Sequence, residues 1–236
     1  MLKTAVIVQS NYIPWKGYFD LIRAADQFVI YDSVQYTRRD WRNRNLIKTP
    51  RGLQWLTVAV NAKGNYHSPI DEVTIADADW TRRHLRTLEV NYRPAAHFDE
   101  TYRWFADAVN TVAAEPKLSR VNEALMQAVC TRLRIATPLI RCTSLVDRKS
   151  LAALDPTDRL VALCRAVGAS RYLSGPSARS YMNLDRFNEA GIDVAWADYD
   201  GYPEYAQLWG PFEHRVSVLD LLFNTGRDAG RYLKAL

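Results

Sequence analysis

Residues 4–25 read TAVIVQSNYIPWKGYFDLIRAA, and the order of apolar and polar residues in this stretch decides the fold. The apolar run at 5–8 predicts a buried strand, since the strands of parallel sheets are covered on both faces. From Lys16 onward apolar residues recur every three to four positions, which predicts an amphipathic helix. Backbone N–H groups at the start of such a helix attract anions, and Gly17 would let a ligand approach the backbone closely.

The loop between this strand and this helix is dense in hydrogen-bonding side chains. One interpretation is that its aromatic rings only pack in the core. In α/β proteins, however, ligands bind beyond the carboxyl ends of the strands, which is where the loop lies. We therefore interpret it as the floor of an active site, with these candidate residues: Gln9, Asn11, Tyr12, Lys16 and Tyr18.

A second apolar run, residues 28–31, predicts a neighbouring strand that ends at Asp32. The carboxyl ends of parallel strands meet at one edge of a sheet. We therefore expect Asp32 and Gln35 to face the same crevice as Gln9, and both are candidate site residues.

Strand and helix patterns alternate at both ends of the chain, with helices between them. The expected elements are a hairpin over 45–60, a loop at Gly64-Asn65, helices at 79–92, at 99–114 and from a cap at Ser119, a strand at 138–140, a helix capped by Asp155, and strands at 172–174 and 192–196. This order predicts an α/β fold with a mostly parallel sheet and a helical middle.

The segment SGPSARSYM, residues 174–182, repeats the logic of the first stretch. A strand ends, a glycine permits a tight turn, and Pro176 suits the first position of a helix, whose start would cradle an anion. The same sequence is about equally compatible with an ordinary turn followed by a serine N-cap. Two such junctions in one chain indicate that both face one ligand, and the candidates here are Ser174, Gly175, Ser177 and Arg179.

Residues 36–48, YTRRDWRNRNLIK, are strongly basic. We interpret them first as a lid that closes over an anionic substrate, with Arg42 and Arg44 as binding residues. A solvated charged face remains a close alternative. A nucleic-acid groove is another, because Tyr36 and Trp41 are interleaved with the cations and could stack bases.

The C-terminal segment DYDGYPEYAQLWGPFEHRVSVLDLLFNTG offers further polar groups near the end of the last strand. Glu204, Gln207 and His214 are such groups, and Gln207 is a candidate binding residue. Asp220 lies in an otherwise apolar helix pattern. A buried carboxylate needs partners, so we expect Asp220 to join a structural hydrogen-bond network.

Composition narrows the class of protein. The chain has 236 residues, 48% of them hydrophobic, and a net charge of +5, which favours acidic partners. No apolar run is long enough to cross a bilayer, so no membrane partner is expected. The three cysteines show no CxxC spacing, which predicts buried free thiols and a cytoplasmic location. The four histidines have no zinc-ligand spacing, and no metal site is expected.

Four segments together carry a family resemblance: AVIVQSNYIPWKGYFDLI, DSVQYTRRDWRNRN, YLSGPSARSYM and YPEYAQLWGPFEHRVSVLDLLFNTG. Over essentially its whole length the chain resembles the WbqC-like protein family. Such proteins occur in bacterial O-antigen and related biosynthetic clusters, and a role as glycine or other aminoacyl transferases acting on amino sugars has been suggested for them. The resemblance implies group transfer in glycan or specialised-metabolite assembly.

A more distant likeness concerns architecture. NYIPWKGYFDLI lies where nucleotidylyltransferases of the HIGH class carry a segment with two histidines, and here Trp15 and Tyr18 replace them. We therefore expect a HIGH-type nucleotidylyltransferase-like, Rossmann-like α/β fold without adenylyl transfer. The whole chain, residues 1–236, should form a single WbqC-like domain, with a helical insertion at 76–136.

The resemblance and the polar floor together predict an acyl or aminoacyl transferase that forms an amide on an amino sugar or a small-metabolite amine. Asp32 would act as base or amine anchor, with Tyr12 and Lys16 as further catalytic residues. Backbone N–H groups near Gly17 and Gly175 would bind the oxyanion. The candidate donors are a carrier-protein thioester, an aminoacyl-tRNA and an adenylate. The alternatives are a non-catalytic nucleotide- or sugar-nucleotide-binding protein and a degenerate nucleotidylyltransferase.

Overall fold

The computed structural model describes residues 2–61 and 67–234. Within that part of the chain, five strands form the central sheet: β1 (Thr4–Val8), β2 (Gln27–Ile30), β5 (Leu139–Arg141), β6 (Arg171–Ser174) and β7 (Asp193–Trp196). All neighbouring strands are parallel, in the order β5-β2-β1-β6-β7. The chain moves outward from β1 through β2 and later continues on the other side of β1 with β6. This is a Rossmann-like sheet, so the predicted α/β fold class is confirmed.

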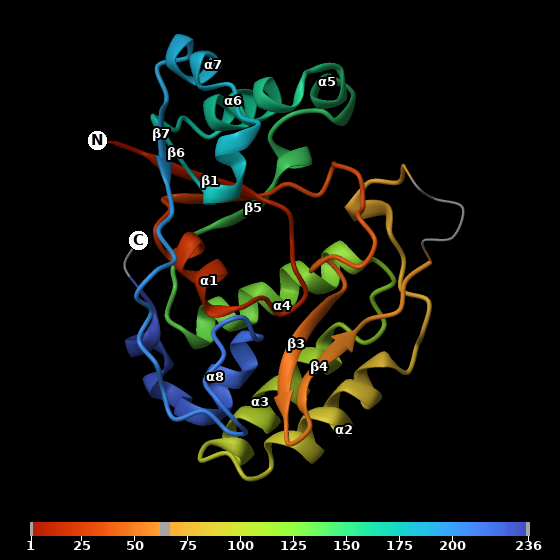
Figure 1. The fold of residues 1–236 in the computed structure, drawn as a ribbon. Coiled ribbons are helices and arrows are strands. Elements are labelled where there is room, and N and C mark those ends of the chain that lie inside the picture. Colours follow the sequence, from red (N-terminus) through yellow and green to blue (C-terminus); the bar gives the residue numbers. More distant parts are fainter. Residues whose placement is uncertain (1, 62–66, 235–236) are drawn as a thin grey trace.

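Helices cover both faces of the sheet (Figure 1). They are α1 (Lys16–Arg23), α2 (Trp80–Tyr92), α3 (Phe98–Thr111), α4 (Leu118–Arg132), α5 (Arg148–Ala153), α6 (Pro156–Ala166), α7 (Leu184–Glu189) and α8 (Val218–Thr225). In β1, Ala5 and Ile7 pack under α5, α6 and α7, whereas Val6 packs on the side of α1 and α4. Successive strand residues thus enter two different cores, which is why the strand is apolar throughout.

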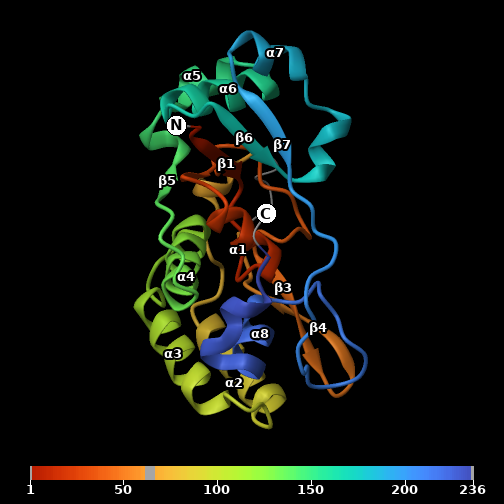
Figure 2. The same cartoon turned by 90° about the vertical axis from the view of Figure 1, so that its left-hand side faces the viewer.

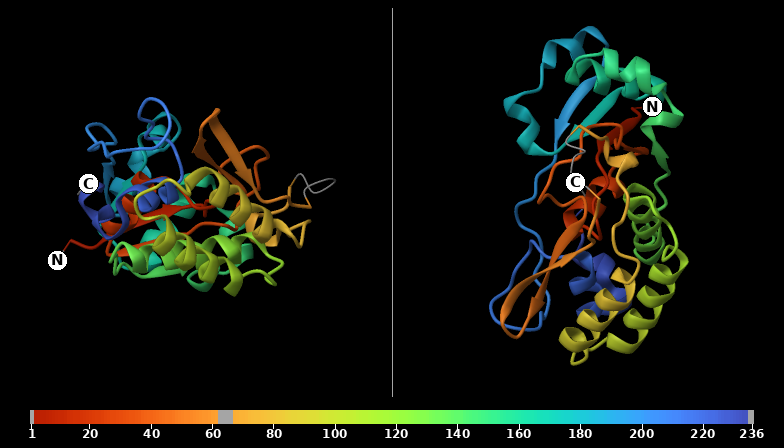
Figure 3. Two further views of the ribbon diagram at one scale, coloured as in Figure 1. Left: turned by 90° about the horizontal axis from the view of Figure 1, so that it is seen from below. Right: turned by 90° about the vertical axis from the view of Figure 1, so that its right-hand side faces the viewer.

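The molecule continues below the sheet as a helical half (Figure 2). It contains α2, α3 and α8, together with an antiparallel hairpin of β3 (Arg44–Thr49) and β4 (Gly52–Thr57). The expected hairpin and the expected helices are therefore present. One hydrophobic core joins these helices to α1 and β1, with Tyr92, Phe105 and Phe223 fully buried in it. Two further views show the hairpin lying beside the segment that precedes α8 (Figure 3).

Two local predictions were wrong. The start of α4 is at Leu118, so Ser119 is not its cap but lies in the first turn, where its hydroxyl donates to Asp32. After β6 a 3-10 helix, η3 (Pro176–Ser180), replaces the expected α-helix, and α7 begins only after Asn183. A turn this short has no helix dipole to attract an anion. The loop expected at Gly64-Asn65 lies outside the described residues.

Other local signals hold. The Asp155 carboxylate accepts from the backbone N–H groups of Thr157 and Asp158 and so caps α6. The cysteines Cys130, Cys142 and Cys164 are free and buried. In the described part of the chain, no helix combines the length and apolar character that a bilayer crossing requires.

Candidate functional site

A cavity of about 600 Å³ opens at the carboxyl edge of the sheet. It lies beside the point where the strand order reverses between β1 and β6, the usual ligand position in open α/β sheets. Of the residues predicted from the sequence, Asn11 and Ser177 line it. One comes from each strand-end junction, so the two junctions do face one cavity.

The loop after β1 is fixed in place by buried hydrogen bonds. The Ser10 backbone N–H and hydroxyl both donate to Asp32, at 2.8 and 2.6 Å, and the Ser119 hydroxyl donates to the same carboxylate. The Asn122 amide donates to the Ser10 hydroxyl and to the Arg42 carbonyl. The loop therefore reaches the cavity already ordered.

Asp32 lies behind the loop rather than in the cavity wall. It is only 3% exposed, and burial raises its pKa against the opposing effect of the Ser10 and Ser119 donors. A carboxylate with this position and these partners orders the loop and does not line the cavity. Gln35 is exposed, and it too lies outside the cavity lining.

Tyr12 and Tyr18 are core residues. The His84 Nε2 lies 3.0 Å from the Thr57 carbonyl oxygen, which can only accept, so Nδ1 accepts from the Tyr12 hydroxyl at 2.7 Å. The Tyr18 hydroxyl donates to the Gln9 carbonyl at 2.8 Å. Burial raises the pKa of both phenols. Both hydroxyls therefore hold the loop from below.

Lys16 is enclosed by aromatic rings. Its ammonium donates to the Pro203 carbonyl at 2.8 Å and lies 5.0 to 5.7 Å from the ring centroids of Tyr202, Tyr205 and Phe212. Burial lowers the pKa of Lys16 to about 8, although the Asp20 and Glu204 charges act in the opposite direction. Its charge anchors the C-terminal segment to the start of α1.

Gly17 does not offer its backbone to a ligand. A Cβ at this position would lie 2.3 Å from the indole of Trp15, so the glycine makes room for that ring. The indole in turn packs against Tyr199 and Tyr202 and lines the cavity. The expected oxyanion site at Gly17 is therefore covered by the protein's own side chain.

The two arginines of the expected lid are tied to the protein. Arg42 donates to the carbonyls of Gln9 and Ser10 and to the Asn11 side-chain oxygen, and its side chain is 14% exposed. Arg44 donates to the Arg39 carbonyl and stacks on the Trp55 ring. Neither guanidinium lies over the cavity as a lid would; Arg42 instead holds the loop that carries the lining residue Asn11.

The junction after β6 is exposed. Ser177 and Arg179 lie in η3, with the Arg179 guanidinium 5.2 Å from the Trp196 ring, whereas Ser174 is buried at the strand end. Gly175 has an ordinary φ of −67°, and a Cβ there would meet only the Tyr199 hydroxyl, at 3.7 Å. This glycine is therefore not required by the backbone.

Gln207 belongs to a buried network outside the cavity. Its amide donates to Asp220 at 2.7 Å and its carbonyl oxygen accepts from Lys48 at 2.8 Å. Tyr92 and Tyr205 donate to the same Asp220 carboxylate. The structural role expected for Asp220 is confirmed, and Gln207 shares it.

The chemistry of the cavity comes from residues that were not candidates from the sequence, although the sequence places His214 among the polar groups near the last strand. His214 lines it, and the buried Nδ1 of this imidazole has no hydrogen-bond partner among the described residues. Burial, followed by the nearby Lys16 charge, lowers the pKa of His214, with Glu204 and Glu213 opposing. The ring is thus neutral at pH 7 and able to accept a proton.

Aromatic and charged groups complete the wall: Trp15, Trp41, Tyr199, Asp200 and Arg215. Tyr199 and Asp200 follow β7, so their place after a strand end was a usable sequence signal. His214 and Arg215 reach the site only because residues 201–215 fold back along the hairpin, which no local pattern shows (Figure 3).

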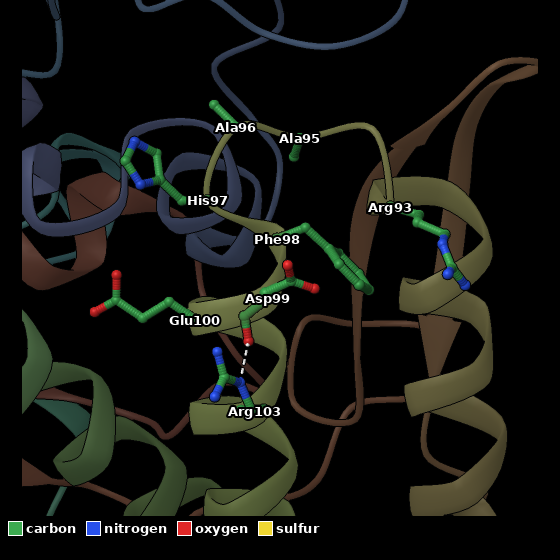
Figure 4. A pocket seen from close by; sticks show the side chains of 8 residues that line it. All are labelled: Arg93, Ala95, Ala96, His97, Phe98, Asp99, Glu100 and Arg103. Atoms are coloured by element: carbon green, nitrogen blue, oxygen red, sulfur yellow. Dashed lines mark hydrogen bonds between the residues drawn. The ribbon is translucent and has the colours of Figure 1, made fainter.

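A second cavity, of about 480 Å³, lies between α2 and α3 at the helical end of the molecule (Figure 4). Its lining comes from one continuous stretch, residues 93–103. Two charged groups there are in ion pairs, Glu100 with Arg132 and Arg227, and Arg93 with Glu89, and the Arg103 side chain donates to the Asp99 backbone carbonyl.

Comparison with known proteins agrees with the resemblance noted from the motifs. A protein of Mycobacterium tuberculosis (strain ATCC 25618 / H37Rv), described as uncharacterized protein Rv1507c, is 51% identical over 235 residues, covering 99% of this chain and 98% of that protein. No solved structure matches the chain. The model of the WbqC-like protein family matches residues 9–232, and the chain therefore belongs to the WbqC-like protein family.

Proposed function

We propose that the protein is a transferase that joins an activated acyl or aminoacyl group to an amine, forming an amide on an amino sugar or a small metabolite in O-antigen-like glycan or specialised-metabolite assembly. The observation that carries the proposal is the His214 imidazole, which lines a cavity at the reversal point of a parallel sheet and whose buried Nδ1 has no hydrogen-bond partner among the described residues. Family membership supports the choice of substrate class.

Amide formation requires a nucleophilic amine that loses a proton as it attacks the carbonyl carbon. A neutral imidazole at the reacting nitrogen accepts that proton. The Arg215 guanidinium and the Ser177 hydroxyl, both in the cavity wall, are donors for the oxyanion that forms. The rings of Trp15 and Tyr199 provide flat apolar faces on which a sugar or an acyl chain packs.

The direct test incubates the purified protein with glycyl donors (thioester, adenylate and tRNA ester) and amino-sugar nucleotides, and detects the amide by mass spectrometry. The substitution His214→Gln should lower turnover about 10²- to 10⁴-fold, which is the usual contribution of a general base, without lowering the melting temperature. The matched control is His67→Gln, since His67 is exposed and lies outside the cavity lining. Absence of product with every donor, or full activity of the His214 variant, would contradict the proposal.

The pH dependence has a defined sign. The pKa of His214 is lowered below its ordinary 6.5, so the imidazole is neutral above that lowered pKa and charged below it. Turnover should therefore be constant near pH 7 and fall as the pH drops through a value below 6.5. The rate measured across pH 4.5–8 in wild type and in His214→Gln checks this, because only the wild type should show the acidic limb.

One observation favours a second function, nucleotide or sugar-nucleotide binding without turnover. The cavity occupies the position where Rossmann-like sheets bind nucleotides. Tyr18, which replaces a histidine of the nucleotidylyltransferase motif, is buried and bonded to Gln9, so it cannot hold a phosphate. Calorimetry with ATP and nucleotide sugars separates the two functions: tight binding with no product under any donor supports this one, and amide product excludes it.

A further inference from the structure

We propose that the acyl donor is the aminoacyl ester at the single-stranded 3′ end of an RNA, whose terminal bases stack on Trp41 and Trp55 at the cavity rim. The inference rests on the proposed transferase function and names its donor. Four features of the hairpin side of the cavity lead to it: exposed paired rings, a stacked guanidinium, clustered cations and an extended track.

Trp41 and Trp55 are large apolar rings left exposed side by side. They are 38% and 41% exposed, and their ring centroids lie 5.3 Å apart at an interplanar angle of 49°. Trp41 also lines the 600 Å³ cavity. Adjacent exposed aromatics at the mouth of a cavity form a surface on which successive bases stack, because every base presents a flat π-face.

Arg44 extends this surface. Its guanidinium lies 3.9 Å from the centre of the Trp55 ring, and its buried Nε has no hydrogen-bond partner among the described residues. Unstacked bases of single-stranded RNA stack on aromatic rings, tryptophan among them, and on arginine guanidinium planes. The stacked pair is therefore a preformed platform.

Positive charge surrounds the platform. Arg38, Arg39 and Arg51 are exposed on the segments that flank Trp41 and Trp55, and the chain as a whole carries +5. Such cations neutralise the phosphates between successive bases. The neighbouring carboxylate, Asp40, is occupied by Thr37 and Arg42.

The surface formed by Trp41, Trp55 and Arg44 continues along the hairpin. A third cavity, of about 340 Å³, is lined by Leu53 and Phe212, and the Phe212 ring packs 4.6 Å from that of His214. The hairpin and residues 209–215 thus line this cavity and the 600 Å³ cavity, and they lie side by side (Figures 2 and 3). A single-stranded RNA, in which bases alternate with phosphates, fits this elongated surface. The slim arm of a carrier-protein thioester has no ring that would use the tryptophan pair.

The step is balanced without a further reactant. The acceptor nitrogen attacks the ester carbonyl carbon, and a C–N bond forms while the C–O bond to the ribose breaks. His214 takes the proton from the nitrogen and returns it to the departing ribose oxygen. The products are the amide and an RNA with a free ribose hydroxyl.

Fluorescence anisotropy with a labelled single-stranded RNA oligonucleotide ending in CCA tests the inference on the full-length protein. Binding should weaken steeply as salt rises. Trp55→Ala and Trp41→Ala should each weaken it about 5- to 150-fold, the contribution of stacking one base. Tyr181→Ala is the control, because Tyr181 is 72% exposed and lies outside both cavity linings. The melting temperature of each variant verifies that it is folded.

The outcomes separate the donor from the reaction. No binding of the oligonucleotide, binding independent of salt, or equal losses in Tyr181→Ala overturns the RNA donor, as does amide product from a carrier-protein thioester but not from the RNA ester. If amide forms from the thioester while RNA does not bind, the transferase function stands and this inference fails. If RNA binds through both tryptophans and no donor gives amide, the platform stands and the transferase function fails.

Discussion

The loops after β1 and after β6 begin alike, each leaving the carboxyl end of a parallel strand beside the same cavity, but they are built differently. The first, residues 9–15, is buried or half-buried and is held by side chains from outside the loop, among them Asp32, Tyr18 and Arg42. The second, residues 175–181, is mostly exposed, and its 3-10 turn makes a short-range bond between Ser180 and Ser177. The cavity thus has one rigid wall and one adaptable wall.

The rigid wall also carries backbone strain. Ile13 has a φ of +35°, which β-branched residues rarely adopt. It is flanked by Tyr12, whose backbone N–H donates to the Trp41 carbonyl and whose carbonyl accepts from Asn45. Strained backbone persists where the surroundings over-determine it, and such places cluster at functional sites. The comparison of the two loops therefore predicts where mutations cost stability and where they do not.

The largest effect should come from Asp32→Ala. It leaves the Ser10 N–H, the Ser10 hydroxyl and the Ser119 hydroxyl buried without their acceptor. Each such donor costs about 1–3 kcal/mol, so the free energy of unfolding should fall by about 3 kcal/mol or more. Urea denaturation measures it. A loss below about 1 kcal/mol would show that the loop after β1 is no more firmly held than the loop after β6.

A smaller loss is expected for Arg42→Ala. The guanidinium makes charge-assisted bonds to residues 9–11, and removing them should cost about 2 kcal/mol. Arg179→Ala in the second loop is the matched control and should change stability by less than about 0.5 kcal/mol. Equal effects of the two substitutions in thermal and urea denaturation would remove the distinction between the walls.

The two glycines give a matched pair of smaller effects. Gly17→Ala places a Cβ against the Trp15 indole, which is wedged beside Tyr199 and Tyr202, and overpacking of this kind costs about 1–3 kcal/mol. Gly175→Ala has room and an ordinary φ, so stability should stay level or rise by about 0.4–1 kcal/mol. Melting curves of the two variants test this difference in stability. An unchanged melting temperature of Gly17→Ala would mean that the Trp15 ring moves freely.

The smallest stability effect should be that of Ser177→Ala. The Ser177 side chain is exposed at the cavity, and replacing it should alter the free energy of unfolding by no more than about 0.5 kcal/mol. If the Ser177 hydroxyl donates to the oxyanion, kcat should fall by up to about 10²- to 10³-fold with the fold intact. Steady-state kinetics on an active donor–acceptor pair measure this, and a destabilised Ser177→Ala protein would contradict the exposed position of η3.

Much of the fold was open to prediction because its signals are local. The apolar run at 5–8 and the three-to-four spacing after Lys16 report burial within a few residues of themselves, and the order of strands and helices then implies a parallel sheet. The hairpin and the Asp155 cap depend on equally short-range chemistry. The capping of α4 by Ser119 failed because a distant carboxylate, Asp32, takes that hydroxyl.

The sequence by itself determined the strand-end junctions and the two lining residues that they contribute, Asn11 and Ser177. Only the tertiary structure decided that Asp32 faces inward, that Arg42 bonds to the loop after β1, and that His214 reaches the cavity from far along the chain. The physical reason is that whether a polar side chain is consumed by a buried hydrogen bond or left uncommitted depends on partners brought together by folding. Residue types and their spacing carry no record of those partners.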